Sequence, residues 1–273
     1  MGADIKKLKN RIRSVSSTMH ITKAMELVAS SKIKTAAERL DASRPYSDAV
    51  GEIIGRLSGC ESPYTEKRGG TRVLCIMIAG DRGLAGGYNN DIFRLFSGFA
   101  EGKEISVLPI GKRALDFAEK KKLDVYESFP SAERFRSDGE TGRRIAEDYA
   151  DGKFDGVYVI FTKYVSALSH TPSVEKLLPI EKSDGKKSDG DIIFEPDEET
   201  VFAAAVPEYL SGKIYGAVCE SFSSELSARR NAMDSATKNA GEMIDSLSIK
   251  YNRARQGAIT QEITEIIGGS ETQ

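Results

Sequence analysis

Residue types that build many catalytic and structural sites are scarce in this chain of 273 residues. It has no tryptophan, three cysteines without CxxC spacing, and two histidines, His20 and His170, far apart in the sequence. So few histidines leave little basis for a zinc site or a histidine-based triad. A small, odd number of cysteines argues against structural disulfides and is typical of a reducing compartment.

Long apolar runs are also missing. The longest, Val73 to Ala79, has the length of a strand, whereas a membrane span needs about 18 residues. No apolar stretch follows the basic N-terminus, so the sequence predicts neither a secretory signal nor a membrane-spanning helix. With 39 basic and 41 acidic residues, the chain is not a generally basic nucleic-acid-binding protein.

Positive charge is nevertheless concentrated at one end. Residues 1–44 contain ten basic and four acidic residues, a net charge of +6. Such a segment predicts an acidic partner: nucleic acid, anionic lipid or an acidic protein surface. The alternative is an ordinary solvated helix face, and charge alone does not decide between the two.

Both ends of the chain have the pattern of long helices. Residues 3–44 lack proline and glycine, and apolar residues recur there at the three- and four-residue spacing of a coiled-coil seam. These residues are Ile5, Leu8, Ile12, Val15 and Met19. We expect the seam then to shift to Ile21, Met25, Val28 and Ile33. Near the other end the expected seam consists of Leu226, Met233, Ala236, Ala240, Met243, Leu247 and Ala254.

Strand and helix patterns alternate between these ends. Buried-strand patterns at 72–79, 105–110 and 156–163 predict an α/β domain with a mostly parallel, Rossmann-like sheet. We assign 1–58 to an N-terminal coiled-coil helix, 59–197 to the inserted α/β domain and 198–273 to a C-terminal coiled-coil helix. Both helices would be longer than a compact domain, so the simplest arrangement pairs them as an antiparallel coiled coil. Residues 183–191 predict a polar loop.

A glycine-rich loop, Gly80 to Asn90, follows the first strand, where a phosphate-binding loop would lie. It lacks both the GxxxxGK[ST] and the GxGxxG pattern, so we interpret it as a tight turn whose glycines permit positive φ and close packing. The alternative is a contact loop that displays Asp81 and Arg82. Nothing else forms a convincing catalytic constellation, and the sequence predicts no cofactor, no metal and no active site.

Three segments of the chain point to a known family. Residues 12–32, 81–90 and 225–269 closely resemble, in order along the whole chain, the gamma subunit of F-type ATP synthase. Arg230, where the family usually has methionine, and the polar C-terminal GGSETQ depart from its pattern. The resemblance implies a non-catalytic rotor shaft inside a ring of three alpha and three beta subunits. This shaft couples ion flow through the membrane c ring to ATP synthesis or hydrolysis on beta.

The resemblance also implies partners and a location. The expected partners are the alpha, beta and epsilon subunits and the c ring, with no nucleic acid. The expected location is the cytoplasmic face of a bacterial plasma membrane, as a peripheral protein, because the helix begins directly after Met1 and leaves no room for a transit peptide. The sequence does not indicate whether the coupling ion is H⁺ or Na⁺.

Particular residues match the family's contact positions. Arg253, Arg255 and Gln256 resemble its contact with a catch loop of beta, and Lys23 and Met25 resemble the helix face near an acidic lever segment of beta. The foot that meets the c ring and epsilon would include Glu208 and Tyr209. An apolar tip would act as a low-friction bearing, or alternatively would be ordinary seam packing; it consists of Ile259, Ile263, Ile266 and Ile267.

Two other function classes are open from the residues alone. A nucleotide-dependent α/β enzyme with helical dimerisation arms predicts that the isolated chain binds or turns over a nucleotide, and the missing phosphate fingerprint argues against it. A coiled-coil scaffold on nucleic acid predicts binding that weakens steeply with salt. The nearly balanced charge of the C-terminal helix argues against that function.

Overall fold

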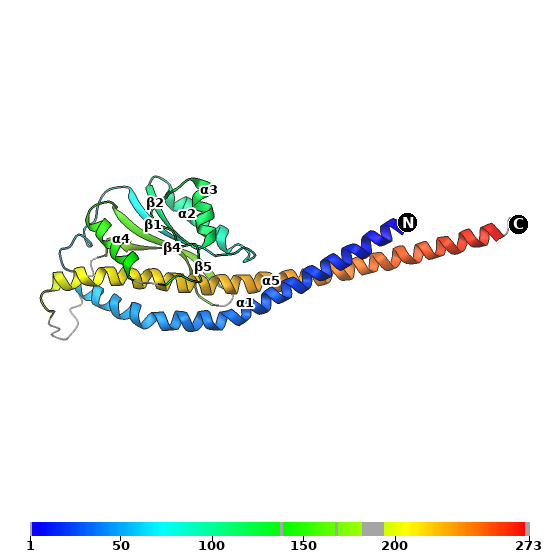
Figure 1. The fold of residues 1–273 in the computed structure, drawn as a ribbon, viewed down its shortest axis with the longest axis horizontal. Helices are drawn as coiled ribbons and strands as arrows, with labels where there is room; N and C mark the ends of the chain where they lie inside the picture. The colour runs from blue at the N-terminus through cyan, green and yellow to red at the C-terminus, as the bar shows by residue number, and fades with distance from the viewer. Residues whose placement is uncertain (1, 137–138, 167–168, 182–193, 271–273) are drawn as a thin grey trace. The chain divides into compact units, whose positions relative to one another are not determined.

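Two long helices dominate the structure, a computed structural model that describes residues 2–136, 139–166, 169–181 and 194–270. They are α1 (Gly2–Leu57) and α5 (Glu198–Ser270), shown in Figure 1. Helix α1 continues through the exposed Pro45. The end of α1 at Leu57 and the start of α5 at Glu198 lie close to the boundaries that we assigned at residues 58 and 198. The division into domains at these residues stays a prediction. The expected polar loop at 183–191 lies outside the described residues.

The chain divides into two compact units, and the first contains residues 1–29 and 230–273. Its two helical segments run antiparallel. The hydroxyl oxygens of Thr22 and Thr237 lie 2.8 Å apart, whereas Leu8, earlier in α1, lines a groove with Leu247, later in α5. The start of α1 therefore lies opposite the region of residue 250, and the last turns of α5 extend beyond it (Figure 1).

One uninterrupted heptad pattern describes the buried side of α1, so the predicted seam shift is wrong. Ile21 and Val28 are each 59% exposed. The seam instead continues from Met19 through Thr22 and Glu26. Polar residues are tolerated there because the Thr22 hydroxyl pairs with that of Thr237 and the Glu26 carboxylate pairs with Lys23 at 3.0 Å. The seam residues, each buried or half-buried, are Ile5, Leu8, Ile12, Val15, Met19, Thr22, Glu26, Ala29, Ile33, Ala36, Leu40, Ser43, Ser47, Val50, Ile54 and Leu57.

The second unit, residues 30–229, contains the α/β domain together with the adjoining segments of α1 and α5. Its five-stranded sheet has the order β3-β2-β1-β4-β5, parallel except for the antiparallel β4–β5 pair. This confirms the predicted mostly parallel α/β domain. The elements are β1 (Arg72–Ile78), α2 (Tyr88–Ala100), β2 (Glu104–Ile110), α3 (Lys112–Lys121), β3 (Asp124–Val125), α4 (Glu140–Ala150), β4 (Gly156–Tyr164) and β5 (His170–Leu178).

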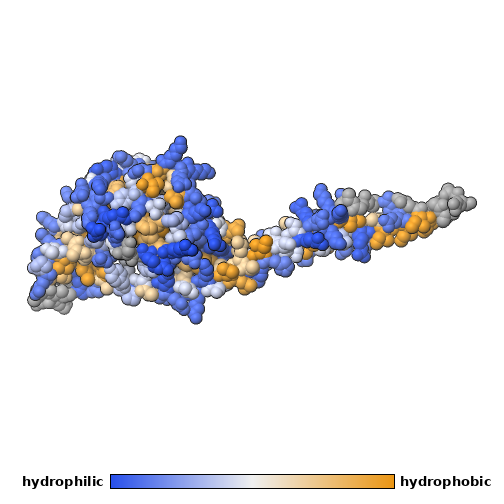
Figure 2. Space-filling view, in the orientation of Figure 1, coloured by the Kyte–Doolittle hydropathy of each residue, from blue (hydrophilic) through white to orange (hydrophobic). Residues whose placement is uncertain are grey.

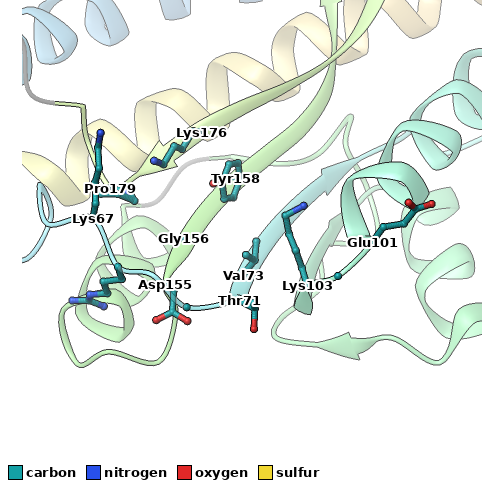
Figure 3. Close-up of a pocket in the computed structure, with 13 residues that line it drawn as sticks. Lys67, Thr71, Val73, Glu101, Lys103, Asp155, Gly156, Tyr158, Lys176 and Pro179 are labelled. Atoms are coloured by element: carbon teal, nitrogen blue, oxygen red, sulfur yellow. The ribbon is translucent and has the colours of Figure 1, made fainter.

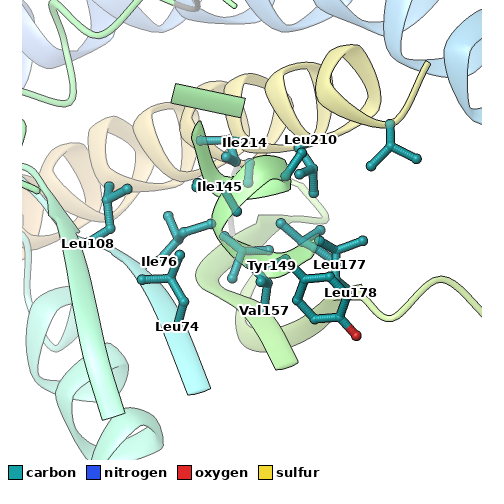
Figure 4. Close-up of a cluster of buried hydrophobic side chains, with 14 of the residues drawn as sticks. Leu74, Ile76, Leu108, Ile145, Tyr149, Val157, Leu177, Leu178, Leu210 and Ile214 are labelled. Carbon is teal, nitrogen blue, oxygen red and sulfur yellow. The ribbon is translucent and has the colours of Figure 1, made fainter. Parts of the chain in front are cut away.

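Strand β1 is apolar after Arg72 because both of its faces are covered from Val73 onward. Its residues Leu74, Ile76 and Ile78 belong to a core with α4 and α5 (Figure 4), and Cys75 and Met77 belong to a second core with α2 and α3. Each fully buried side chain of this size contributes about 1.5–3 kcal/mol. Helix α5 is thus part of the domain core as well as of the coiled coil. Its residues in the first core are Phe202, Val206, Leu210, Ile214, Ala217 and Val218.

Candidate functional site

The carboxyl ends of the parallel strands form the first site to consider, because ligands of doubly wound sheets bind there. After β1 the chain reaches Asp81, whose carboxylate accepts hydrogen bonds from the Ser131 hydroxyl (2.6 Å) and from the backbone N–H groups of Ala132 (2.8 Å) and Glu133 (3.3 Å). In a phosphate-binding site, a bound phosphate would accept hydrogen bonds from such N–H groups. The chain's own carboxylate already occupies this position.

A second carboxylate, that of Glu225 on α5, closes the same region. It is 3% exposed and lies so close to Gly80 that a Cβ at this glycine would be 2.7 Å from the carboxylate. Arg229 pairs with Glu225 and also donates to the carbonyls of Arg82 (3.4 Å) and Gly83 (3.3 Å). Burial raises the pKa of Glu225, and the charge of Arg229 opposes that shift. Two carboxylates here disfavour a nucleotide phosphate.

The glycine-rich loop has the predicted tight-turn geometry. Gly86 has a φ of 60° and Leu84, which sequence analysis did not single out, has a φ of 62°. The Asn89 side chain holds the loop together, because its carbonyl oxygen accepts the N–H of Gly80 at 2.9 Å and its amide donates to the Arg82 carbonyl at 3.3 Å. Asp81 is bound internally, as described above, so only the exposed Arg82 side chain is available for the alternative of a contact loop.

A cleft of about 430 Å³ lies at the opposite, amino-terminal edge of the sheet (Figure 3). Lys67, Lys103 and Lys176 line it, which suggests an anion site. However, two of its other charged groups are satisfied within the chain: Arg68 donates to the Phe154 carbonyl at 3.0 Å, and Asp155 pairs with Arg72 at 2.9 Å. The Lys103 ammonium lies 4.2 Å from the ring centre of Phe99. The cleft is therefore not organised around a missing ligand.

Metal and membrane sites were also considered. Within the described ranges, no group of three or more histidine, cysteine, aspartate or glutamate residues is arranged to hold a metal ion. His20 is exposed. No described helix combines the length and the apolar character that a membrane crossing requires.

The residues matched to beta contacts all lie in the first unit. Lys23 is exposed and Met25 is half-buried, and Arg253, Arg255 and Gln256 are exposed on α5. Among the described residues, neither Arg253 nor Arg255 forms an ion pair, so both guanidinium groups face solvent. These positions are accessible to a partner, and their contacts remain a prediction.

Sequence analysis missed an exposed apolar group on the same part of α1. Ile21, Leu27 and Val28 are each 59% exposed, although Ile21 and Val28 were assigned to the seam. Extending the initial heptad through Thr22 and Glu26 would have placed them outside. Local spacing does not indicate that polar residues are accepted in the seam, because the supporting Thr22–Thr237 contact joins residues far apart in the chain.

The apolar tip of α5 is exposed rather than packed in a seam. Ile259, Ile263, Ile266 and Ile267 have exposed fractions of 44, 51, 72 and 55%. Their spacing places them on one side of the helix, and Figure 2 shows apolar side chains gathered along this end of α5. An ordinary intrachain seam therefore does not account for them.

The proposed foot residues lie in the second unit. Glu208 is exposed and accepts a hydrogen bond from the Tyr46 hydroxyl at 2.6 Å. That bond is the main reason that the pKa of Tyr46 rises to about 12. Tyr209 is half-buried against the first core, and the Lys213 ammonium lies 5.7 Å from its ring centre. Glu208 is the more accessible of the two predicted contact residues.

Comparisons with known proteins agree over the whole chain. A sequence profile of the family described as ATP synthase matches residues 4–272. The ATP synthase gamma chain of Ruminococcus albus is 42% identical over 281 aligned positions, covering 98% of each chain. That of Moorella thermoacetica is 40% identical, covering 98% of this chain and 99% of its own. A gamma chain described as sodium ion specific, from Acetobacterium woodii, is 36% identical, covering 99% of each.

Solved structures have the same fold. A chain in the OSCP/F1/c-ring structure of the Euglena gracilis mitochondrial ATP synthase superposes with a TM-score of 0.77 at 18% identity, covering 100% of this chain and 95% of its own. A chain in the rotor structure of the same enzyme gives 0.72 at 17% identity, covering 95% of this chain and 100% of its own. The antiparallel long helices with an inserted α/β domain are thus a known arrangement.

Proposed function

This chain belongs to the ATP synthase gamma-chain family, and from that premise we propose that it is the central rotor of an F-type ATP synthase. The observation that supports this function best is the antiparallel pairing of α1 with α5 in both units. Two wound helices resist bending and twisting better than one, and a shaft that transmits torque needs that stiffness.

The rotor acts by stabilising different states of its neighbours. One asymmetric chain inside a ring of alternating alpha and beta subunits presents a different face to each beta subunit. It can therefore favour an open state in one beta and a closed state in another, as a shift of populations requires. Ion flow drives the rotation, supplying about 2.3 kcal/mol per charge per 100 mV.

The chain is a subunit of the enzyme complex and itself contributes no catalytic group. Asp81 and Glu225 fill the crevice where a nucleotide of a doubly wound sheet would lie. The chemistry of ATP takes place on beta, with an arginine from alpha. This argument disfavours the alternative of a nucleotide-dependent enzyme with helical arms.

The partners follow from the same membership. One copy of the chain serves three alpha and three beta subunits, and the foot meets epsilon and the c ring at the cytoplasmic face of the bacterial plasma membrane. Arg253, Arg255 and Gln256 contact the beta catch loop, and Lys23 and Met25 lie near the acidic lever segment. The net charge of +6 at the front end suits that acidic partner.

The tip and the foot complete the set of proposed contacts. Ile259, Ile263, Ile266 and Ile267 form the bearing, because apolar contacts lack directional bonds and give small barriers to rotation. Glu208 and Tyr209 contact the c ring or epsilon.

Rotation in a reconstituted complex tests this function. Cys75 and Cys219 are buried, so a label is placed at an introduced cysteine, Lys112→Cys on α3, with Cys60→Ser removing the half-buried thiol. The chain is assembled with alpha and beta, and the label is followed after ATP is added. We expect unidirectional rotation in three steps per turn, one for each beta subunit. A well-assembled complex that hydrolyses ATP without rotation of the label would contradict the rotor function.

A further inference from the structure

The face of α5 that packs on the sheet changes its chemistry after Val218. Up to that residue the face is mostly apolar, with Ser211 as a buried exception, and Leu210 and Ile214 pack against α4 and the sheet (Figure 4). Beyond it, buried polar residues continue the same face at helical spacing: Ser221 (1% exposed), Ser224 (0%) and Glu225 (3%). A fully buried polar stripe costs free energy unless each group is hydrogen-bonded, so its partners are informative.

The two serine side chains bond to the backbone of the α/β domain. The hydroxyl of Ser221 accepts the N–H of Thr162 at 3.0 Å, and the hydroxyl of Ser224 donates to the carbonyl of Thr162 at 3.3 Å. Next to Ser221, the Glu220 carboxylate accepts the N–H of Tyr164 at 3.2 Å. The end of β4 is therefore fastened to α5 by hydrogen bonds.

The glycine-rich loop is fastened by the other half of the stripe. Glu225 lies against Gly80, and Arg229 bridges Glu225 to the carbonyls of Arg82 and Gly83. The Tyr88 hydroxyl, buried at the start of α2, donates to the Ser221 carbonyl at 2.9 Å. Two separate segments of the domain, β4 and the 80–90 loop, thus bond to one stretch of helix.

We propose that the stretch Glu220–Arg229 is the joint through which the α/β domain passes torque to α5, with Glu225 and Arg229 as its positioning residues. This inference rests on the rotor function proposed above. Glu208 and Tyr209 lie on α5 itself, but force that the c ring or epsilon applies to the rest of the α/β domain reaches α5 through their common interface. Apolar contacts are not directional, whereas a hydrogen bond weakens steeply as its angle departs from linear. The polar stripe therefore resists rotation of the domain about the helix.

The chain would then use apolar contacts where it must rotate against its neighbours and buried hydrogen bonds where two of its own parts must stay fixed together. The tip of α5, which must turn freely inside its neighbours, exposes isoleucines. The joint, which must not slip, buries directional bonds. Neither property is needed for the fold itself, since apolar packing of the kind seen at Leu210 and Ile214 would hold a helix on a sheet equally well.

The double variant Glu225→Met with Arg229→Met tests the joint. Removing one partner alone would leave a buried charge and risk unfolding, whereas replacing both with apolar residues of similar size removes the bonds of this pair, including those of Arg229 to the 80–90 loop, and preserves packing. The matched control is Arg143→Met with Glu147→Met, an exposed pair of the same spacing on α4. Each variant is assembled both as the complex with alpha and beta alone and as the complete ATP synthase in vesicles.

The two assemblies separate a joint from a structural role. Without the c ring no load acts on the domain, so we expect ATP hydrolysis by the alpha–beta–gamma complex to stay within about twofold of the original. In vesicles energised by an imposed ion gradient and membrane potential, we expect ATP synthesis by the double variant to fall about fivefold or more, and that of the control to be unchanged. Arg229→Lys, which keeps the charge but not the forked donor, should give a smaller loss.

Several results would contradict the proposal that Glu220–Arg229 transmits torque to α5. Synthesis by the double variant equal to that of the control would show that the bonds carry no torque. An equal loss of hydrolysis and synthesis, or failure of the variant chain to assemble, would assign the pair to folding. These results leave the rotor function intact as long as the original chain supports synthesis and its label rotates. Absence of both in the original complex would contradict the rotor function itself.

Discussion

Glu225 is nearly inaccessible to water, yet it carries a group that is ordinarily ionised. Its position is tolerable because Arg229 pairs with it. Burial raises the pKa of Glu225, with Asp81 and Glu133 acting in the same direction. Removing Arg229 alone therefore measures the cost of leaving the Glu225 carboxylate buried without a partner.

We expect Arg229→Ala to lower the free energy of unfolding of the full-length chain by about 3–5 kcal/mol at pH 7.5, because it leaves a buried charge unpaired. The loss should be smaller at pH 5. A carboxyl whose pKa is raised by folding binds a proton more tightly in the folded chain, so stability increases as the pH falls from the raised folded value toward the ordinary value of 4.5. Urea unfolding at both pH values measures this.

Glu225→Gln in the Arg229→Ala background is the control for that pH dependence. The amide cannot ionise, so the difference in stability between pH 5 and pH 7.5 that comes from this site should disappear. If the pH dependence persisted in the double variant, another group would be responsible and the assignment to Glu225 would be wrong.

Two glycines within helices show how backbone approach fixes the packing of α4 on α5. A Cβ at Gly142 would lie 2.1 Å from the Ser211 hydroxyl oxygen and 2.5 Å from the Pro207 carbonyl oxygen, whereas a Cβ at Gly98 on α2 would meet nothing within 4 Å. Gly142→Ala should therefore destabilise the chain by about 1–3 kcal/mol. Gly98→Ala should stabilise it by up to about 1 kcal/mol through helix propensity.

Thermal unfolding of the two glycine variants distinguishes close packing from propensity. The substitution is chemically identical at the two sites, but the surroundings differ. We therefore expect the melting temperature to fall for Gly142→Ala and to rise for Gly98→Ala. Equal shifts would mean that α4 moves away from α5 at little cost, and that the close approach does not hold the two helices in place.

The register of α1 can be tested by a pair of glutamine substitutions. Val28→Gln should change the free energy of unfolding by no more than about 0.5 kcal/mol, because the side chain is 59% exposed. Met19→Gln, at a half-buried seam position, should cost about 1–2 kcal/mol. Urea unfolding of the full-length chain measures both free energies. A larger loss of stability for Val28→Gln than for Met19→Gln would show that the seam does shift to Val28.

The elements differed in how far local sequence could predict them. Strand β1 could be predicted because burial on both faces leaves a continuous apolar run in the sequence. The first five seam residues could be predicted from their spacing alone. The seam beyond Met19 was not, because Thr22 is accepted through a hydroxyl on α5. The Glu225–Arg229 pair was missed for the same reason: a glutamate in a helix is ordinarily solvated, and only the close approach of Gly80 buries it.

At the scale of the whole chain, the proposed function depends on exposed surfaces that do not stabilise the fold of the chain itself. The resemblance of three segments supplied the family and its contact positions, and composition alone supplied neither. What the structure adds is the distinction between residues that hold the chain together and residues that face outward. Arg255 and Gln256 are exposed on α5, so removal of either should leave the chain's own stability almost unaltered.

The last prediction uses that distinction. Arg255→Ala and Gln256→Ala should each leave the free energy of unfolding of the chain within about 0.5 kcal/mol. In the assembled complex, however, ATP hydrolysis should fall about fivefold or more if these side chains contact beta. Lys250→Ala, also exposed on α5 and basic, is the control and should retain hydrolysis. Parallel losses of stability and activity in Arg255→Ala would contradict an interface contact, because a side chain that faces solvent can reduce turnover without unfolding the chain only by losing a partner.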